Sequence, residues 1–153
     1  MNLDATDHAL LRALSASGRS TFAQLAEETG LSTSATQARV RRLEAEGVIS
    51  GYRAVIDPEE VGMPIAAFVE ITPLDPAQPD DAPRRLEALS EITACHSIAG
   101  DASYMLTVRV ATPRALEELL GRIRSTAGVR TRTTVALQTF FERPPLPDQT
   151  KYN

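Results

Sequence analysis

The sequence predicts an α+β protein that joins an N-terminal helix-turn-helix domain, winged-helix-like in outline, to a C-terminal ferredoxin-like βαββαβ domain. Two observations support this fold class. The first 50 residues place apolar side chains at helical spacing, whereas the residues after 64 switch between strand and helix periodicity in the order of a split βαβ unit. We therefore expect residues 1–50 to form the first domain, 51–63 a linker, 64–142 the second domain and 143–153 a tail.

Three short helices are predicted in the first domain. The first begins at the N-cap residue Asp4. The second begins at Thr21, with Gln24 where a capping box needs it. The third runs from Ser32 to about Ala45, and only Gly30-Leu31-Ser32 separates it from the second. Two helices joined by so short a turn predict a helix-turn-helix.

After the third helix, residues 48–56 have the pattern of extended chain, interpreted as either a small wing or a strand that links the domains. The second domain then begins. Its strands are expected at 65–71, 92–99, 104–110 and 129–141, and its helices at 84–90 and 112–127. Both helices would cover one face of the sheet. The other face would carry Ala66, Phe68, Met105 and Ala136, which are too apolar for a wetted surface, so we expect a homodimer.

The third helix is predicted to read double-stranded DNA. At about 100° per residue, Thr36, Val40 and Leu43 form a packed stripe. On the opposite face, Gln37 and Arg41 are long enough to reach base edges in the major groove. The full set of expected DNA-contacting residues is Thr21, Ser32, Thr33, Ser34, Gln37, Ala38, Arg39, Arg41 and Arg42.

Arg39 and Arg42 are better placed for phosphates than for bases. An alternative interpretation is a solvated arginine face paired with nearby glutamates on the same or the preceding helix. In that case Arg41 or Arg42 would pair with Glu27, Glu44 or Glu46.

The charge distribution does not oppose DNA binding. The chain carries a net charge of −4, all of it in residues 57–153, while residues 1–56 are neutral and have three of their arginines between positions 39 and 42. A local basic face is what has to meet phosphates. No apolar run is long enough to span a bilayer and no secretory signal is visible at the start, so we expect no membrane partner and a cytoplasmic, nucleoid-associated protein.

Catalytic and metal-binding patterns are weak. Cys95 is the single cysteine, which fits a reducing compartment. It neighbours His96 on a predicted strand, so the two side chains point to opposite faces and cannot form a nucleophile–base pair. His8 and His96 are too few for a recognisable metal cluster, and no glycine-rich phosphate loop is present. The sequence therefore predicts no enzyme, no cofactor and no metal.

Several motifs resemble the Lrp/AsnC, or feast/famine, family of transcriptional regulators. They are Leu3-Asp4-x-x-Asp7, Gly18-Arg19, Gln24-Leu25-Ala26 with Gly30-Leu31-Ser32, the run from Arg39 to Tyr52, Gly100-Asp101, Tyr104, Gly128-Val129 and the threonines 131, 133 and 134. The resemblance covers roughly residues 2–141 and is closest to actinobacterial members.

The resemblance implies a regulator whose assembly or DNA binding responds to an amino acid or a related metabolite. Family members pair through their sheets, and the dimers often assemble into octamers. The effector commonly binds between dimers, near the turn after the second strand. The residues expected there are Gly100, Asp101, Ala102, Ser103, Tyr104, Thr133 and Thr134. Glycine lets backbone N–H groups approach a carboxylate, and Asp101 can hold an ammonium group. The alternative is that Gly100-Asp101 only makes a hairpin turn.

Two positions depart from the family pattern. Ser103 stands where a second acidic residue is common, which bears on the choice of effector. Thr36 stands in the core where an aliphatic residue is usual, and its hydroxyl is expected to bond back to a helix carbonyl.

Two other functions stay open. Sirohaem decarboxylases share the two-domain arrangement and would use a basic pocket served by His96, and an architectural protein would coat DNA with little sequence preference.

Overall fold

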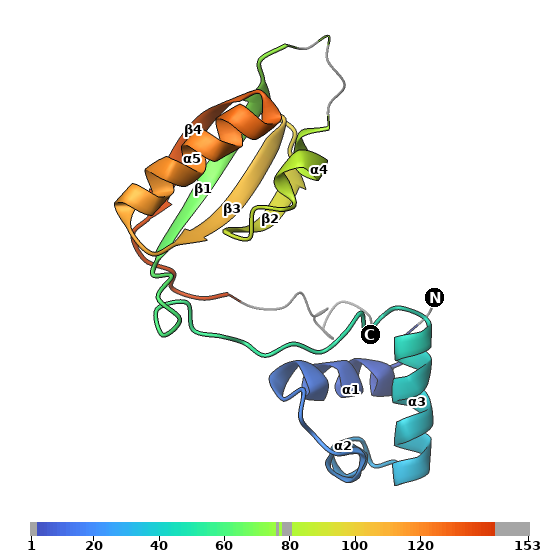
Figure 1. Ribbon diagram of the computed structural model, residues 1–153. Helices are drawn as coiled ribbons and strands as arrows, with labels where there is room; N and C mark the ends of the chain where they lie inside the picture. Colours follow the sequence, from blue (N-terminus) through green and yellow to red (C-terminus); the bar gives the residue numbers. More distant parts are fainter. Residues whose placement is uncertain (1–2, 76, 78–80, 143–153) are drawn as a thin grey trace. The chain divides into compact units, whose positions relative to one another are not determined.

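The structure, a computed structural model, describes residues 3–75, 77 and 81–142 (Figure 1). These residues fall into two compact units, one built around residues 3–55 and the other on residues 56–140. Each unit has a hydrophobic core of its own. Among the described residues, no helix is long and apolar enough to cross a membrane.

The first unit contains helices α1 (Ala5–Ala16), α2 (Phe22–Thr29) and α3 (Thr33–Ala45). The expected N-caps are confirmed: the side chains of Asp4, Thr21 and Ser32 each accept a hydrogen bond from a backbone N–H in the first turn of their helix. Gln24 completes the capping box of α2 as predicted. Because these bonds join residues three apart, the start of each helix is determined locally.

Three fully or almost fully buried side chains, Leu10, Leu25 and Val40, form the core of this unit, one from each helix. Gly30 ends α2 in the left-handed conformation with φ of 69°, which turns the chain directly into the N-cap of α3. After α3, the backbone N–H of Ile49 donates to the carbonyl of Leu43, and Ile49 packs back against the core. The helix-turn-helix predicted from the sequence is therefore present.

Residues 48–56, where the sequence pattern suggested a wing or a linking strand, form neither a helix nor a strand. The reason is physical: a strand is stabilised by hydrogen bonds to a neighbouring strand, and the described residues of the first unit contain none. The exposed apolar side chains Val55 and Ile56 are what gave this segment its strand-like pattern.

The second unit is a four-stranded antiparallel sheet with two helices. Its elements are β1 (Ile65–Pro73), α4 (Ala82–Leu86), β2 (Ile92–Ser97), β3 (Tyr104–Val110), α5 (Pro113–Ala127) and β4 (Val129–Ala136). The strand order is β2-β3-β1-β4. Both helices pack into one core on one face of the sheet, which is the ferredoxin-like arrangement that the sequence predicts.

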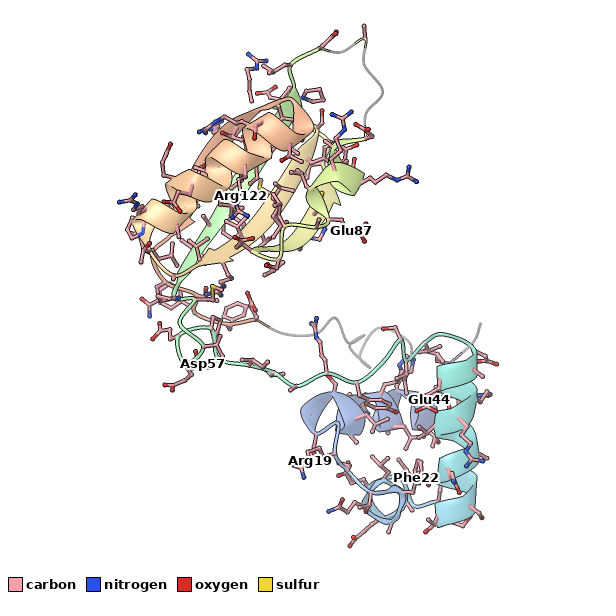
Figure 2. All side chains as sticks on the ribbon, in the orientation of Figure 1. Arg19, Phe22, Glu44, Asp57, Glu87 and Arg122 are labelled. Carbon is pink, nitrogen blue, oxygen red and sulfur yellow. The ribbon has the colours of Figure 1, made fainter. Side chains whose placement is uncertain are left out.

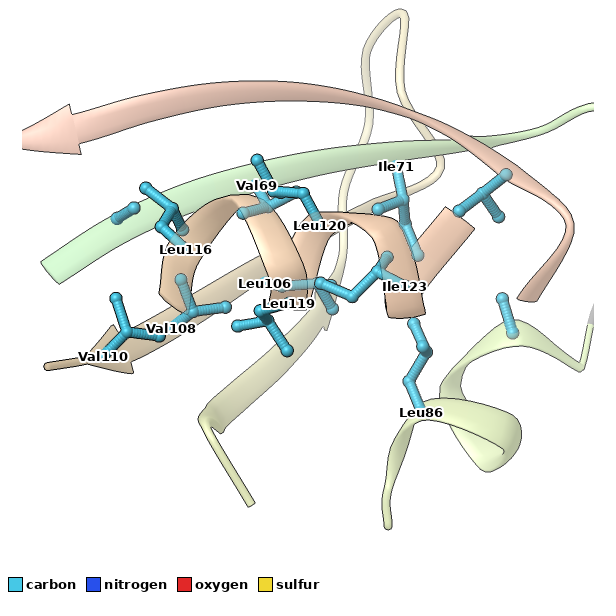
Figure 3. Packing of buried hydrophobic residues seen from close by; sticks show 13 residues of the cluster. Val69, Ile71, Leu86, Leu106, Val108, Val110, Leu116, Leu119, Leu120 and Ile123 are labelled. Atoms are coloured by element: carbon cyan, nitrogen blue, oxygen red, sulfur yellow. The ribbon is translucent and has the colours of Figure 1, made fainter. Parts of the chain in front are cut away.

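The core of this unit lies between α5 and the two central strands (Figure 3). From α5 come Leu116, Leu119, Leu120 and Ile123, at the spacing of one helix face. They pack on alternate residues of β1 and β3, including Val69. Burial of a large aliphatic side chain contributes about 1.5–3 kcal/mol, so this contact dominates the stability of the unit.

Three expected boundaries are wrong by a few residues. β4 ends at Ala136 and not at Phe141. Ala136 pairs with Ala66, the second residue of β1, so the residues after Ala136 have almost no β1 backbone left to pair with. β2 ends at Ser97, which leaves a longer loop before β3. α4 spans Ala82–Leu86 in place of 84–90, with proline at the start of the helix, where proline is favoured.

The sheet face opposite the helices carries the apolar residues predicted for it. Phe68 is paired with Thr107 and Thr134, Ala66 with Ala136, and Glu70 with Met105. These residues alternate with core residues such as Val69, so they point away from α4 and α5. Phe68 is exposed within the chain.

Candidate nucleic-acid interface

Helix α3 presents the polar face that the sequence predicts. Thr36, Val40 and Leu43 are buried, as expected from their spacing. On the other side, Ser34, Ala38 and Arg41 are exposed, and Gln37 is half-buried. Arg41 makes no hydrogen bond or ion pair with any other described residue. Small residues at 34 and 38 flank a free guanidinium, so this face can approach a groove closely.

The turn before α3 is polar and its hydroxyl groups are engaged in capping. Ser32 Oγ accepts from the backbone N–H of Ala35 at 3.2 Å and lies 3.2 Å from Ser34 Oγ. Thr21 Oγ1 accepts from the N–H of Gln24 at 3.3 Å and donates to its side-chain oxygen at 3.1 Å. Thr33 is exposed at the first position of α3. Free N–H groups at such helix starts attract phosphate oxygens.

Arg39 and Arg42 bind the start of α1, in a group of four residues that we call the Asp–Arg cluster: Asp4, Asp7, Arg39 and Arg42. Arg39 Nη1 lies 2.6 Å from Asp4 Oδ2 and 2.9 Å from Asp7 Oδ1. Arg42 Nη2 lies 2.7 Å from Asp7 Oδ2. These partners are not the glutamates considered in the sequence analysis, and they join residues 32 and 35 apart in the chain.

The Asp–Arg cluster also closes the N-terminus of α1. The backbone N–H of Asp7 donates to Asp4 Oδ1 at 2.8 Å, and the N–H of Asp4 donates to Asp7 Oδ2 at 3.1 Å. The bond from Arg39 lowers the pKa of the Asp4 carboxyl, and in turn the pKa of Arg39 is raised. Asp7 is only 1% exposed and is fully paired, as a buried charge must be.

The hydroxyl of Thr36 is a departure from expectation. Thr36 is fully buried, and its Oγ1 has no hydrogen-bond partner among the described residues. The predicted bond to a helix carbonyl is therefore not formed. The backbone N–H of Thr36 is satisfied by the carbonyl of Ser32, so only the side chain is left unpaired.

Tyr52 fastens the chain to α3 just after the helix-turn-helix. Its hydroxyl donates to Glu44 Oε1 at 2.8 Å, and Glu44 lies near the C-terminal end of α3 (Figure 2). The Tyr52 ring packs over Gly18, where an added Cβ would lie 3.7 Å from Cδ1 of the ring. Burial, together with the bond to Glu44, raises the pKa of Tyr52 to about 12. The sequence analysis did not assign this contact.

Of the expected effector residues, 100–103 lie on the loop between β2 and β3, and Tyr104 is the first residue of β3. Gly100 and Asp101 are exposed, and Ala102 is buried. The N–H of Ser103 donates to the carbonyl of Ile71 at 3.0 Å, which ties the loop to β1. Gly100 does not adopt a positive φ, and a Cβ added there would meet no atom within 4 Å. The loop spans residues 98–103 and connects the antiparallel strands β2 and β3, and the N–H of Ile98 donates to the carbonyl of Ser103 at 3.1 Å.

Thr133 and Thr134 are not brought to that loop within one chain. They pair with Val69 and Phe68 of β1, and β1 separates β4 from β3. As neighbours on a strand they also point to opposite faces of the sheet.

The structure gives little support to catalysis. Cys95 pairs with Leu106, and His96 pairs with Met105, so they face opposite sides of the sheet as predicted. Burial raises the pKa of the Cys95 thiol, which makes it a poorer nucleophile. Cys95 borders an open hollow of about 400 Å³ between α4 and β2, which Glu87 also lines. No group of three metal-ligating side chains occurs among the described residues.

Comparisons with known proteins agree with this architecture. Residues 3–50 match a family model described as winged helix-turn-helix DNA-binding, and residues 66–146 match the Lrp/AsnC ligand binding domain. The chain is 60% identical over 139 residues to the HTH-type transcriptional regulator LrpA of Mycobacterium tuberculosis, covering 91% of this chain and 93% of that protein. It is 39% identical over 141 residues to the leucine-responsive regulatory protein of Haemophilus influenzae, with 89% and 84% covered.

A solved structure adds a three-dimensional match. The feast or famine regulatory protein of M. tuberculosis complexed with L-methionine superposes with a TM-score of 0.93 at 58% identity, covering 95% of this chain and 100% of that one. The match extends over both units, each with the elements described above. The chain therefore belongs to the Lrp/AsnC family of transcriptional regulators, with an N-terminal helix-turn-helix DNA-binding domain and a C-terminal Lrp/AsnC ligand-binding domain.

Proposed function

We propose that this regulator binds DNA as a homodimer, reads sequence with α3 and changes its assembly or DNA affinity when an amino acid binds. The free, exposed guanidinium of Arg41 on a helix whose opposite face is buried supports this proposal best. An arginine that has no partner among the described residues gains most from a base edge or a phosphate.

In this proposal Gln37 and Arg41 contact bases, while Ser34 and Ala38 allow close approach to the groove floor. Thr21, Ser32 and Thr33 present hydroxyl and backbone N–H groups to phosphates. Arg39 and Arg42 flank this face and reach phosphates through the part of each guanidinium that the Asp–Arg cluster leaves exposed. Dimer symmetry would place two such helices at half-sites one helical turn, or a multiple of it, apart.

The dimer is proposed to form through the sheet face that carries Phe68, and dimers to assemble further, up to an octamer. Exposed apolar side chains on a small sheet favour association because it removes them from water. A second chain would also supply what one chain lacks: Thr133 and Thr134 near the 100–104 loop of its partner. The M. tuberculosis protein solved with L-methionine makes methionine the first effector to test.

We further propose residues 1–50 as the DNA-binding domain, 51–63 as the linker and 64–142 as the effector and assembly domain. Residues 143–153, expected to be a tail, lie outside the described residues. The proposed setting is the nucleoid in the cytoplasm, and the proposed role is regulation and not catalysis. Two relatives that share most of the chain length are named as an HTH-type transcriptional regulator and a leucine-responsive regulatory protein.

Binding to the DNA upstream of its own gene, compared with scrambled DNA of equal length across a salt series, tests sequence reading. We expect a preference for the upstream DNA that survives moderate salt and is lost in Arg41→Ala. Arg19→Ala is the matched control, because it removes the same charge from an exposed position of the same unit. Equal affinity for both DNAs would indicate an architectural protein, and no binding at all would contradict the proposal.

Titration with L-methionine tests the effector site. We expect it to change either the sedimentation coefficient or the affinity for upstream DNA, and Asp101→Asn to weaken the response by removing the charge that would hold the ammonium group. Glu87→Gln, an exposed carboxylate on the same unit away from the loop, is the control. If saturating L-methionine changed neither property, regulation by this ligand would be excluded.

A further inference from the structure

The Asp–Arg cluster holds two of the arginines of α3 with carboxylates from α1. Arg39 donates to both Asp4 and Asp7, and Arg42 donates to Asp7. The two positive and two negative charges cancel. When a guanidinium that is already paired with a carboxylate binds a DNA phosphate, fewer counterions leave the DNA, because the positive charge is partly neutralised before binding.

Both guanidinium groups nevertheless remain within reach of an external anion. The side chain of Arg39 is 31% exposed and that of Arg42 is 46% exposed. A guanidinium has five N–H donors, and the contacts in the cluster use one nitrogen of each arginine. A DNA phosphate beside α3 would therefore compete with the aspartates for the same cations.

Asp4 and Asp7 differ in what they contribute. Asp7 is buried and its carboxylate joins α1 to α3, so it is needed for the fold. The side chain of Asp4 is 52% exposed, and among the described residues its ion pair is with Arg39. Its capping bond needs only a neutral oxygen acceptor, which serine or asparagine also provides. The negative charge of Asp4 is thus not required for capping.

We propose that Asp4 is a positioning residue that competes with DNA phosphate for Arg39 and so restrains sequence-independent binding. This inference rests on the proposed function, since it concerns how strongly a DNA-binding face holds any DNA. Lowering the phosphate contribution increases the relative weight of the base contacts proposed for Gln37 and Arg41. The acidic residue next to the DNA-reading helix would then improve discrimination between sites at the expense of total affinity.

The test compares Asp4→Asn and Asp4→Ser with Glu28→Gln in the full chain. All three remove one negative charge from the first unit, but Glu28 lies exposed on α2 and has no ion pair with the described residues. The probe is a duplex of random sequence, titrated between about 50 and 200 mM salt. We expect both Asp4 variants to bind more tightly, with the slope of log K against log salt steeper by about 0.9 for each DNA-bound domain. Glu28→Gln should leave the slope unchanged.

A second comparison identifies the released group. The increase in affinity for random DNA in Asp4→Asn should disappear when Arg39→Ala is added. The Asp4→Asn variant should also prefer upstream over random DNA less strongly than the wild type does. Slopes that match Glu28→Gln in both Asp4 variants would overturn the inference, as would a gain that persists without Arg39. Failure of the wild type to bind any duplex would instead overturn the proposed function itself, and the inference with it.

Discussion

At the scale of single residues, Thr36 is the clearest place where the chain departs from good packing chemistry. Its buried hydroxyl has no partner in the part of the chain that the structure describes, and leaving such a group unpaired costs about 1–3 kcal/mol. Thr36→Val keeps the shape and removes the hydroxyl, so we expect the free energy of unfolding of the first unit to rise by about 1 kcal/mol. Urea denaturation followed by circular dichroism measures this change. Thr126→Val, at an exposed position of α5, should change it by less than about 0.5 kcal/mol.

Tyr52 gives the protein a pH dependence at alkaline values. Its pKa is raised to about 12 in the folded chain, above the value of about 10 for an unfolded tyrosine. The neutral hydroxyl is therefore favoured by folding, and its contribution is complete below about pH 10 and lost as the pH rises towards 12. The wild type should lose stability over this window more steeply than Tyr52→Phe. If stability fell in parallel for the two proteins across this window, the pKa of Tyr52 would not be raised by folding.

At the scale of elements, replacing glycine with alanine should have opposite effects on stability at two positions. Gly30 ends α2 with a φ of 69°, where a side chain costs about 1–2 kcal/mol. Gly121 lies inside α5, where alanine is better than glycine by about 0.5–1 kcal/mol and an added Cβ meets nothing within 4 Å. We expect Gly30→Ala to lower the melting temperature and Gly121→Ala to raise it. A stabilised Gly30→Ala would mean that the turn does not need the left-handed conformation.

The elements also show how far sequence reasoning extends. The three N-caps of the first unit were predictable because each uses a bond between residues three apart. The helices and strands of the second unit were predictable in order and type from their periodicity. The end of β4 was not, because it depends on where β1 begins, and Ile65 lies 71 residues before the observed end at Ala136.

The candidate site likewise combines features that the sequence predicts with features that it does not. The spacing of Thr36, Val40 and Leu43 was enough to locate the polar face of α3. The pairing of Arg42 with Asp7 joins residues 35 apart and depends on how α1 crosses α3, which no local pattern encodes. The only signal was the Asp4-x-x-Asp7 spacing, which is that of a capping box with aspartate at both positions. Packing of distant elements thus decides which arginines are free.

At the scale of the whole molecule, the open sheet face predicts self-association. Phe68 lies at its centre, paired with Thr107 on one side and Thr134 on the other. Phe68→Glu should lower the mass measured by sedimentation velocity, because a carboxylate cannot be buried without a partner. Leu74→Glu, an exposed position after the end of β1, should leave the mass unchanged. A wild type that sediments as one chain would contradict the predicted dimer.

The order of the strands also determines when each unit can fold. The helices of the first unit contact one another over separations of at most a few tens of residues, and such local topologies fold quickly. The second unit cannot complete its sheet until β4 has been synthesised, because Ala136 pairs with Ala66 across 70 residues. During synthesis the helix-turn-helix is therefore finished first. In that interval one edge of β1 lacks its neighbour and is open to pairing with other chains, so the sheet domain is where aggregation of nascent chains would begin.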